Sequence, residues 1–221
     1  MTFSDELRWG YFLASPKLNL ALNKNAEEII ALAAKKMGTS KRNAISLALV
    51  EILKNSYDKR FVDLLANEIK LSIATASTIS EQMHTMLEGI ERHGYSRRVF
   101  FGLLISDYFL HNQDKFIEQA DPNDSDMGKG SIEITLDQET KDKIMAYCQA
   151  NSMTVGSLFS HYILHEDINV DSYEISEKAY LNLIFSNSVK KVLENKVKST
   201  NRTYRFYLNL VAEQIIRNIS T

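Results

Sequence analysis

Apolar and polar positions alternate at the start of residues 17–53 and then shift to helical spacing. Leu18, Leu20 and Leu22 alternate with polar or small residues, which predicts a short strand with one apolar face. The positions that follow predict two consecutive helices. The same order returns at residues 131–164. Because a strand this short needs a partner, the repeat predicts two units that each require a second strand.

Residues typical of helix ends mark the helices of the first unit. Asn25 is predicted to cap the first helix, with Glu28 completing a capping box. Gly38 is predicted to end that helix in the left-handed conformation. Ser40 is predicted to cap the second helix. In the repeat, Thr154 stands at the position that corresponds to Ser40.

Less regular helical pairs are predicted at residues 77–110 and 186–216, where Ser96 and Thr200 mark the helix starts. Two apolar stretches come directly before these pairs and can supply the partner strands. They are Lys70–Ala76 and Ala179–Phe185. If they do, each ribbon closes within the chain. If they do not, strands pair between two chains in a homo-oligomer. Both stretches can also be helical, since periodicity is ambiguous for short apolar runs.

The pattern predicts a mainly α fold with short antiparallel β-ribbons, divided into two domains. Residues 1–118 form the first, including an N-terminal arm whose aromatic residues favour a packed segment over a partner site. Residues 119–129 are rich in Asp, Asn, Ser and Gly and are predicted to be a linker. Residues 130–221 form the second domain. The aromatic residues of the arm are Trp9, Tyr11 and Phe12.

Charge is segregated along the chain, although the net charge is only −2. Residues 17–60 carry nine basic and four acidic side chains, and residues 178–221 carry eight and two. Residues 114–177 carry four basic and fourteen acidic side chains. The whole-chain value therefore hides two basic segments that suit a nucleic-acid partner, or equally a solvated helix surface.

Several functional classes lack support in the sequence. The single cysteine, Cys148, excludes an internal disulfide framework and fits the reducing cytoplasm. No apolar run is long enough for a membrane span, and the first residues lack the features of a signal peptide. His161 and His165 have zinc-binding spacing but too few neighbouring ligands. No catalytic or cofactor-binding motif is present, so we expect neither enzyme activity nor a cofactor.

The strand register, the Gly-x-Ser turn and the helix lengths at 17–53 resemble those of the MetJ/Arc ribbon-helix-helix superfamily, in particular its plasmid copy-control repressors. The resemblance implies tandem ribbon-helix-helix units that bind double-stranded DNA, with a two-stranded ribbon in the major groove. It implies that the outward strand residues contact bases. It also implies that the start of the second helix binds a phosphate. The base-contacting residues would be Lys17, Asn19 and Ala21, and the phosphate-binding residues Thr39, Ser40, Lys41 and Arg42.

The second unit departs from this pattern, because Glu133 stands where Asn19 stands in the first. A carboxylate there can accept from cytosine but repels phosphate. We therefore expect a DNA-binding repressor, or an accessory protein of plasmid transfer or partition. The alternative is an interaction scaffold or antitoxin-like adaptor on a degenerate ribbon-helix-helix frame. Further candidate DNA contacts are Ser131, Thr135, Arg97, Arg98 and Arg202.

Overall fold

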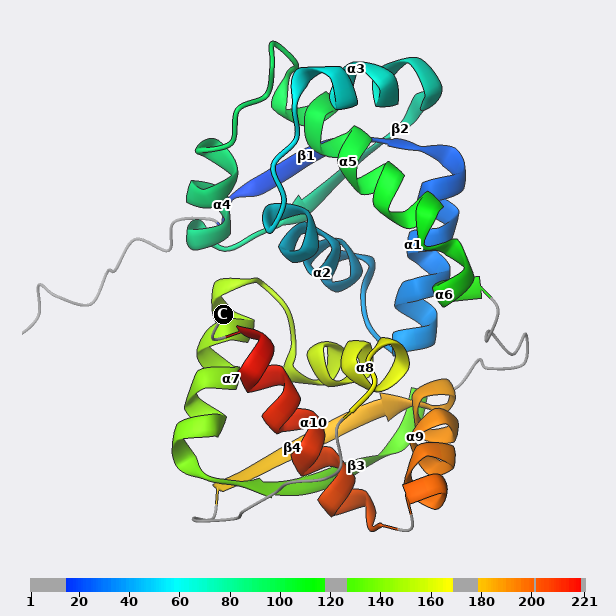
Figure 1. Ribbon diagram of the computed structural model, residues 1–221, viewed down its shortest axis with the longest axis vertical. Helices are drawn as coiled ribbons and strands as arrows, with labels where there is room; N and C mark the ends of the chain where they lie inside the picture. Colours follow the sequence, from blue (N-terminus) through cyan, green and yellow to red (C-terminus); the bar gives the residue numbers. More distant parts are fainter. Residues whose placement is uncertain (1–14, 118–126, 169–178, 201, 220–221) are drawn as a thin grey trace, which may run out of the picture.

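The computed structural model describes residues 15–117, 127–168, 179–200 and 202–219. The fold is mainly helical, with two small antiparallel sheets of two strands each, as predicted. We call residues 15–117 the first half and residues 127–219 the second half. In Figure 1 the first half is the upper part and the second half is the lower part, with α2 and α8 facing each other between them.

The first half contains two strands, each followed by a helical pair. Its elements are β1 (Lys17–Asn23), α1 (Lys24–Met37), α2 (Lys41–Leu53), α3 (Lys59–Glu68), β2 (Leu71–Thr78), α4 (Glu81–Glu88), α5 (Arg97–His111) and α6 (Gln113–Ile117). Helices α3 and α6 are additions to the four predicted helical pairs. Strands β1 and β2 form the first ribbon, with Asn19 opposite Ala76. The prediction that residues 70–76 supply the partner strand within the chain is confirmed.

The described part of the second half repeats this order without the additional helices. Its elements are β3 (Met127–Leu136), α7 (Gln138–Ala150), α8 (Val155–His165), β4 (Ala179–Ser186), α9 (Asn187–Thr200) and α10 (Tyr204–Ile219). Strands β3 and β4 form the second ribbon, with Glu133 opposite Asn182, so this partner strand is also confirmed. Strand β3 begins at Met127, within the residues 119–129 that the sequence assigns to a linker. The register is irregular between Met127 and Ser131.

The inner face of each ribbon is covered by helices. Leu18, Leu20 and Leu22 of β1 are almost completely buried. Figure 1 shows α5 passing in front of the first ribbon and α10 in front of the second. Helix α5 contacts β1 and α10 contacts β3, so both ribbons lie on the same side of the molecule, behind these helices in the figure.

The helix ends agree with the sequence at most positions and differ at two. Gly38 adopts φ 65° at the end of α1, and Ser40, Ser96 and Thr154 accept hydrogen bonds from the first turns of α2, α5 and α8. The cap of α1 is Asn23 and not Asn25, because the helix follows the strand without a loop.

The second difference lies between α9 and α10. Helix α9 continues to Thr200, and Thr203 supplies the hydroxyl that accepts from the backbone N–H of Phe206. The predicted cap Thr200 instead donates its hydroxyl to the carbonyl of Lys196 in the preceding turn. A Ser or Thr inside a helix can donate its hydroxyl to the carbonyl four residues earlier, and this hydrogen bond competes with capping of the next helix.

Candidate nucleic-acid interface

The outer face of the first ribbon presents three of the predicted site residues. Lys17 and Asn19 are exposed, and Ala21 is partly buried. Their cross-strand neighbours on β2 are Thr78 opposite Lys17, Ala76 opposite Asn19, and Ala74 opposite Ala21. The described part of this face therefore carries one positive charge, one amide and small side chains, and no carboxylate. Small neighbours leave room for another surface to approach the Asn19 amide.

The base-contacting residues predicted from the sequence belong only to the β1 half of this face. The β2 half consists of Ser72, Ala74, Ala76 and Thr78, of which the first three are exposed. Its signal was present in the sequence, because these residues alternate with Leu71, Ile73 and Thr75. The cross-strand register was needed to decide which of them stand beside Asn19.

The first ribbon rests directly on α5. At Gly102 a Cβ atom would lie 2.0 Å from the carbonyl oxygen of Ala21, so no larger residue fits without a backbone shift. Val99 packs against the core, and Phe101 and Ile105 are fully buried. Buried leucines and a close helix contact hold the ribbon in one position, so its outer side chains project from a rigid support.

The start of α2 is occupied partly by contacts to the second half. The Thr39 and Ser157 hydroxyl oxygens lie 2.6 Å apart, and the Asn43 amide donates to both. Arg42 Nη2 donates to the carbonyl of Ser152 at 3.1 Å. Of the four predicted phosphate-binding residues, Thr39 and Arg42 thus contribute to the contact between the halves.

The other two predicted phosphate-binding residues, Ser40 and Lys41, are exposed. The Ser40 hydroxyl accepts from the backbone N–H of Asn43, and the Lys41 ammonium pairs with Glu27. An exposed ion pair of this kind contributes little to stability, so Lys41 can exchange Glu27 for another anion at small cost.

The start of α5 presents two arginines in different environments. Arg97 Nη1 lies 2.7 Å from Glu88 Oε1 and donates to His84 Nε2 at 3.0 Å. A hydrogen bond from Arg92 and the positive charge of Arg97 lower the pKa of Glu88. Arg98 is exposed. Arg97 is therefore a structural cation, and Arg98 is the arginine with a solvent-facing side chain.

The second ribbon has a different outer face. Ser131 lies opposite Ile184, and Glu133 lies opposite Asn182. Ile184 is 58 % exposed and Tyr180 is 51 % exposed. This face thus combines a carboxylate with two large apolar side chains.

Two predicted contacts in the second half are already engaged. Thr135 is buried, and its hydroxyl accepts a hydrogen bond from Arg205 of α10. It therefore has no free surface for the DNA contact that the sequence suggested. The guanidinium carbon of Arg202 lies 5.0 Å from the centre of the Phe206 ring, the geometry of a cation–π contact.

The histidines of α8 and the cysteine of α7 pack against other parts of the protein. His161 and His165 lie at a cavity that also includes Glu51 of α2 and Phe116 of α6. Among the described residues no group of three or more His, Cys, Asp or Glu can hold a metal ion. Burial raises the pKa of Cys148 to about 12, which keeps its thiol protonated and unreactive.

Comparison with known proteins identifies no relative of this chain. No protein-family model matches the chain, and neither the curated proteins nor the solved structures include a significant match. Within the described ranges, no helix has both the length and the apolar character needed to cross a bilayer.

Proposed function

We propose that the protein binds double-stranded DNA through the first ribbon, as a tandem ribbon-helix-helix protein without enzyme activity. The observation that carries this proposal is the outer face of the first ribbon. It exposes Lys17 and Asn19 among small residues on a rigid two-stranded support. A two-stranded ribbon fits the major groove, where an amide can bond adenine and an ammonium can bond guanine.

On this proposal, exposed groups near the ribbon contact the phosphate backbone of the DNA. Ser40 and Lys41 at the start of α2 and Arg98 at the start of α5 are exposed. Helix N-termini favour phosphate through their free N–H groups and dipole. Arg42 would contribute mainly by holding the halves together, because its guanidinium donates to Ser152.

The biological role that we propose is that of a cytoplasmic transcriptional repressor or an accessory protein of plasmid transfer or partition. This role derives from the resemblance of residues 17–53 to plasmid copy-control repressors. A second candidate function is that of a protein-interaction scaffold or antitoxin-like adaptor. It is favoured by the second ribbon, where Glu133 stands among exposed Tyr180 and Ile184.

The test is binding of duplex DNA from upstream of the protein's own gene, measured by fluorescence anisotropy at two salt concentrations. Lys17→Ala combined with Asn19→Ala should abolish preference for that DNA over an unrelated duplex. Lys59→Ala is the matched control, because it removes the same charge from α3, where Lys59 pairs with Asp63. No DNA binding at low salt, or equal loss in the control, would refute the proposal and favour the scaffold.

A further inference from the structure

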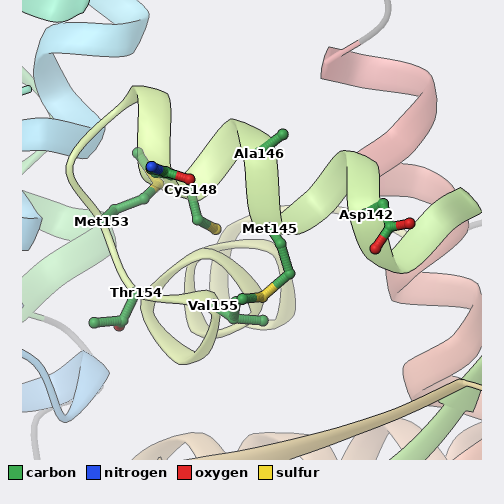
Figure 2. A pocket seen from close by; sticks show the side chains of 8 residues that line it. Asp142, Met145, Ala146, Cys148, Met153, Thr154 and Val155 are labelled. Atoms are coloured by element: carbon green, nitrogen blue, oxygen red, sulfur yellow. The ribbon is translucent and has the colours of Figure 1, made fainter. Parts of the chain in front are cut away.

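An apolar groove lies on the second half. It has a volume of about 500 Å³ and runs between α7 and the turn that leads into α8. Figure 2 shows the side chains of Met145, Cys148, Met153 and Val155 gathered around it. Met145 is 47 % exposed, and Asp142 is the only charged residue of the lining. An open hollow with two methionines is suited to an apolar side chain.

The described chain begins close to this groove. The carbonyl of Pro16 accepts from the backbone N–H of Ile79 at 2.9 Å. The next residue, Ser80, donates its hydroxyl to the carbonyl of Ala150, the last residue of α7. Met145 lies five residues before Ala150, roughly 7.5 Å along the helix at 1.5 Å per residue. The preceding fourteen residues can therefore reach the groove, since an extended chain spans roughly 3.3 Å per residue.

Residues 1–14 have the composition of a docking segment. Besides Met1, six of them are large apolar or aromatic residues, and Arg8 is their only basic residue. Arg8 stands directly before Trp9 in the sequence, and the groove carries the single carboxylate Asp142 beside Met145. The segment also contains Asp5 and Glu6, so Arg8 is the side chain of the segment that can pair with Asp142. The six residues are Phe3, Leu7, Trp9, Tyr11, Phe12 and Leu13.

We propose that residues 1–14 dock into the α7–α8 groove, with Trp9 against Met145 and Arg8 near Asp142. The segment would then join the first half to the second by a contact separate from the α2–α8 interface. A tryptophan brings the largest apolar surface of any side chain to such a contact. The proposal is independent of DNA binding.

The test uses Trp9 as the reporter, because it is the only tryptophan in the chain. In the full-length protein we expect blue-shifted Trp9 emission and slow quenching by acrylamide, independent of protein concentration. Met145→Lys should shift the emission to the red and raise the quenching constant severalfold. Leu64→Lys is the matched control, since Leu64 is 50 % exposed on α3. It should leave the emission of Trp9 unchanged.

A charge exchange separates docking from a general loss of structure. Arg8→Glu should increase quenching, and adding Asp142→Arg should restore protection. Solvent-like emission of Trp9 in the unmodified protein would overturn the proposal. So would protection that Met145→Lys leaves intact, or protection that disappears on dilution and thus indicates a second copy as the occupant. Circular dichroism of each variant identifies any that fails to fold.

Discussion

Gly102 decides how closely α5 approaches the first ribbon. The carbonyl of Ala21 occupies the space that a side chain at 102 would need. Nothing in the local sequence marks this requirement, because a glycine inside a helix is ordinarily a weak residue. The contact between α5 and β1 explains why the glycine stands there.

Gly102→Ala should lower the free energy of unfolding by about 1–3 kcal/mol, because the added methyl forces the helix away from the strand. Chemical denaturation measures this loss. Gly89→Ala is the control, since its Cβ would lie 3.5 Å from the nearest oxygen and its φ is −73°. Helix propensity alone would make both variants more stable, so a gain in stability for Gly102→Ala would contradict the close contact.

Asn19→Ala should relax the preference for one base pair by about 1–3 kcal/mol and leave the fold unchanged. The reason is that Asn19 is exposed on the outer face, while its neighbours in the sequence are buried leucines. Binding to a set of DNA duplexes with single base-pair changes measures this effect. Uniform weakening across the whole set would argue that Asn19 does not contact a base.

At the scale of elements, α8 connects the two halves through the partly buried imidazole of His165. The rings of His165 and Phe116 of α6 are 5.2 Å apart. Burial, followed by the charges of His161 and of the lysines at 36, 115 and 196, lowers the pKa of His165 to about 3. Burial also lowers the pKa of His161 to about 4, against the opposing effect of Glu51.

These pKa values predict acid sensitivity. An unfolded histidine takes up a proton below a pH of about 6.5, whereas the folded protein resists protonation until pH values near 3 to 4. The unfolded state therefore binds more protons, and the free energy of unfolding should fall as pH decreases from about 6.5. Denaturation between pH 7.5 and 5 measures the slope, at pH values above the range where carboxylates titrate.

The double variant His161→Gln with His165→Gln is the control for this prediction. It should be less stable at neutral pH, but its free energy of unfolding should change less between pH 7.5 and 5. An unchanged slope would assign the acid sensitivity to other groups.

The strands show how far a sequence pattern can predict an element. The sequence allows either partner strands or helices at 70–76 and 179–185, and the structure has them as strands β2 and β4. Helix α3 was not predicted, because it buries only Val62 and Leu65 and its apolar stripe is short. A short helix of this kind depends on tertiary packing more than on its own sequence.

At the scale of the molecule, part of the contact between the halves consists of small polar groups. Asn43 donates to Ser157, and the Ser186 hydroxyl donates to the carbonyl of Lys36 at 2.5 Å. Gly38 lies so close to Ser186 that an added Cβ would be 2.9 Å from its Cβ. Water can replace such hydrogen bonds when the halves separate, so this polar part of the interface can be exposed at modest cost.

The first half alone, residues 1–118, should therefore fold as a monomer of lower stability than the full chain. Its ribbon pairs β1 with β2 and needs no second chain. Sedimentation equilibrium of the fragment, with circular dichroism across a dilution series, measures both properties. An obligate dimer, or a fragment that unfolds on dilution, would show that the second half is required for folding.

The sequence by itself determined the strand of β1 and the strand residues 131–136 of β3, most helix ends, and the inward and outward faces of β1. These features follow from local rules: a period of two in strands, a period near 3.6 in helices, and caps that satisfy free N–H groups. Two helix ends were wrong by two or three residues, since Asn23 and Thr203 cap helices assigned to Asn25 and Thr200. At the start of each of these two helices, two nearby polar residues are able to act as the N-cap.

Only the tertiary structure decided which predicted site residues are free. Thr39 and Arg42 contact the second half, and Thr135 is covered by Arg205. Lys17 and Asn19 remain exposed. These outcomes depend on residues about 70 to 120 positions apart in the sequence. Local periodicity carries no information about such distant neighbours, because it reports the face of an element and not what packs against that face.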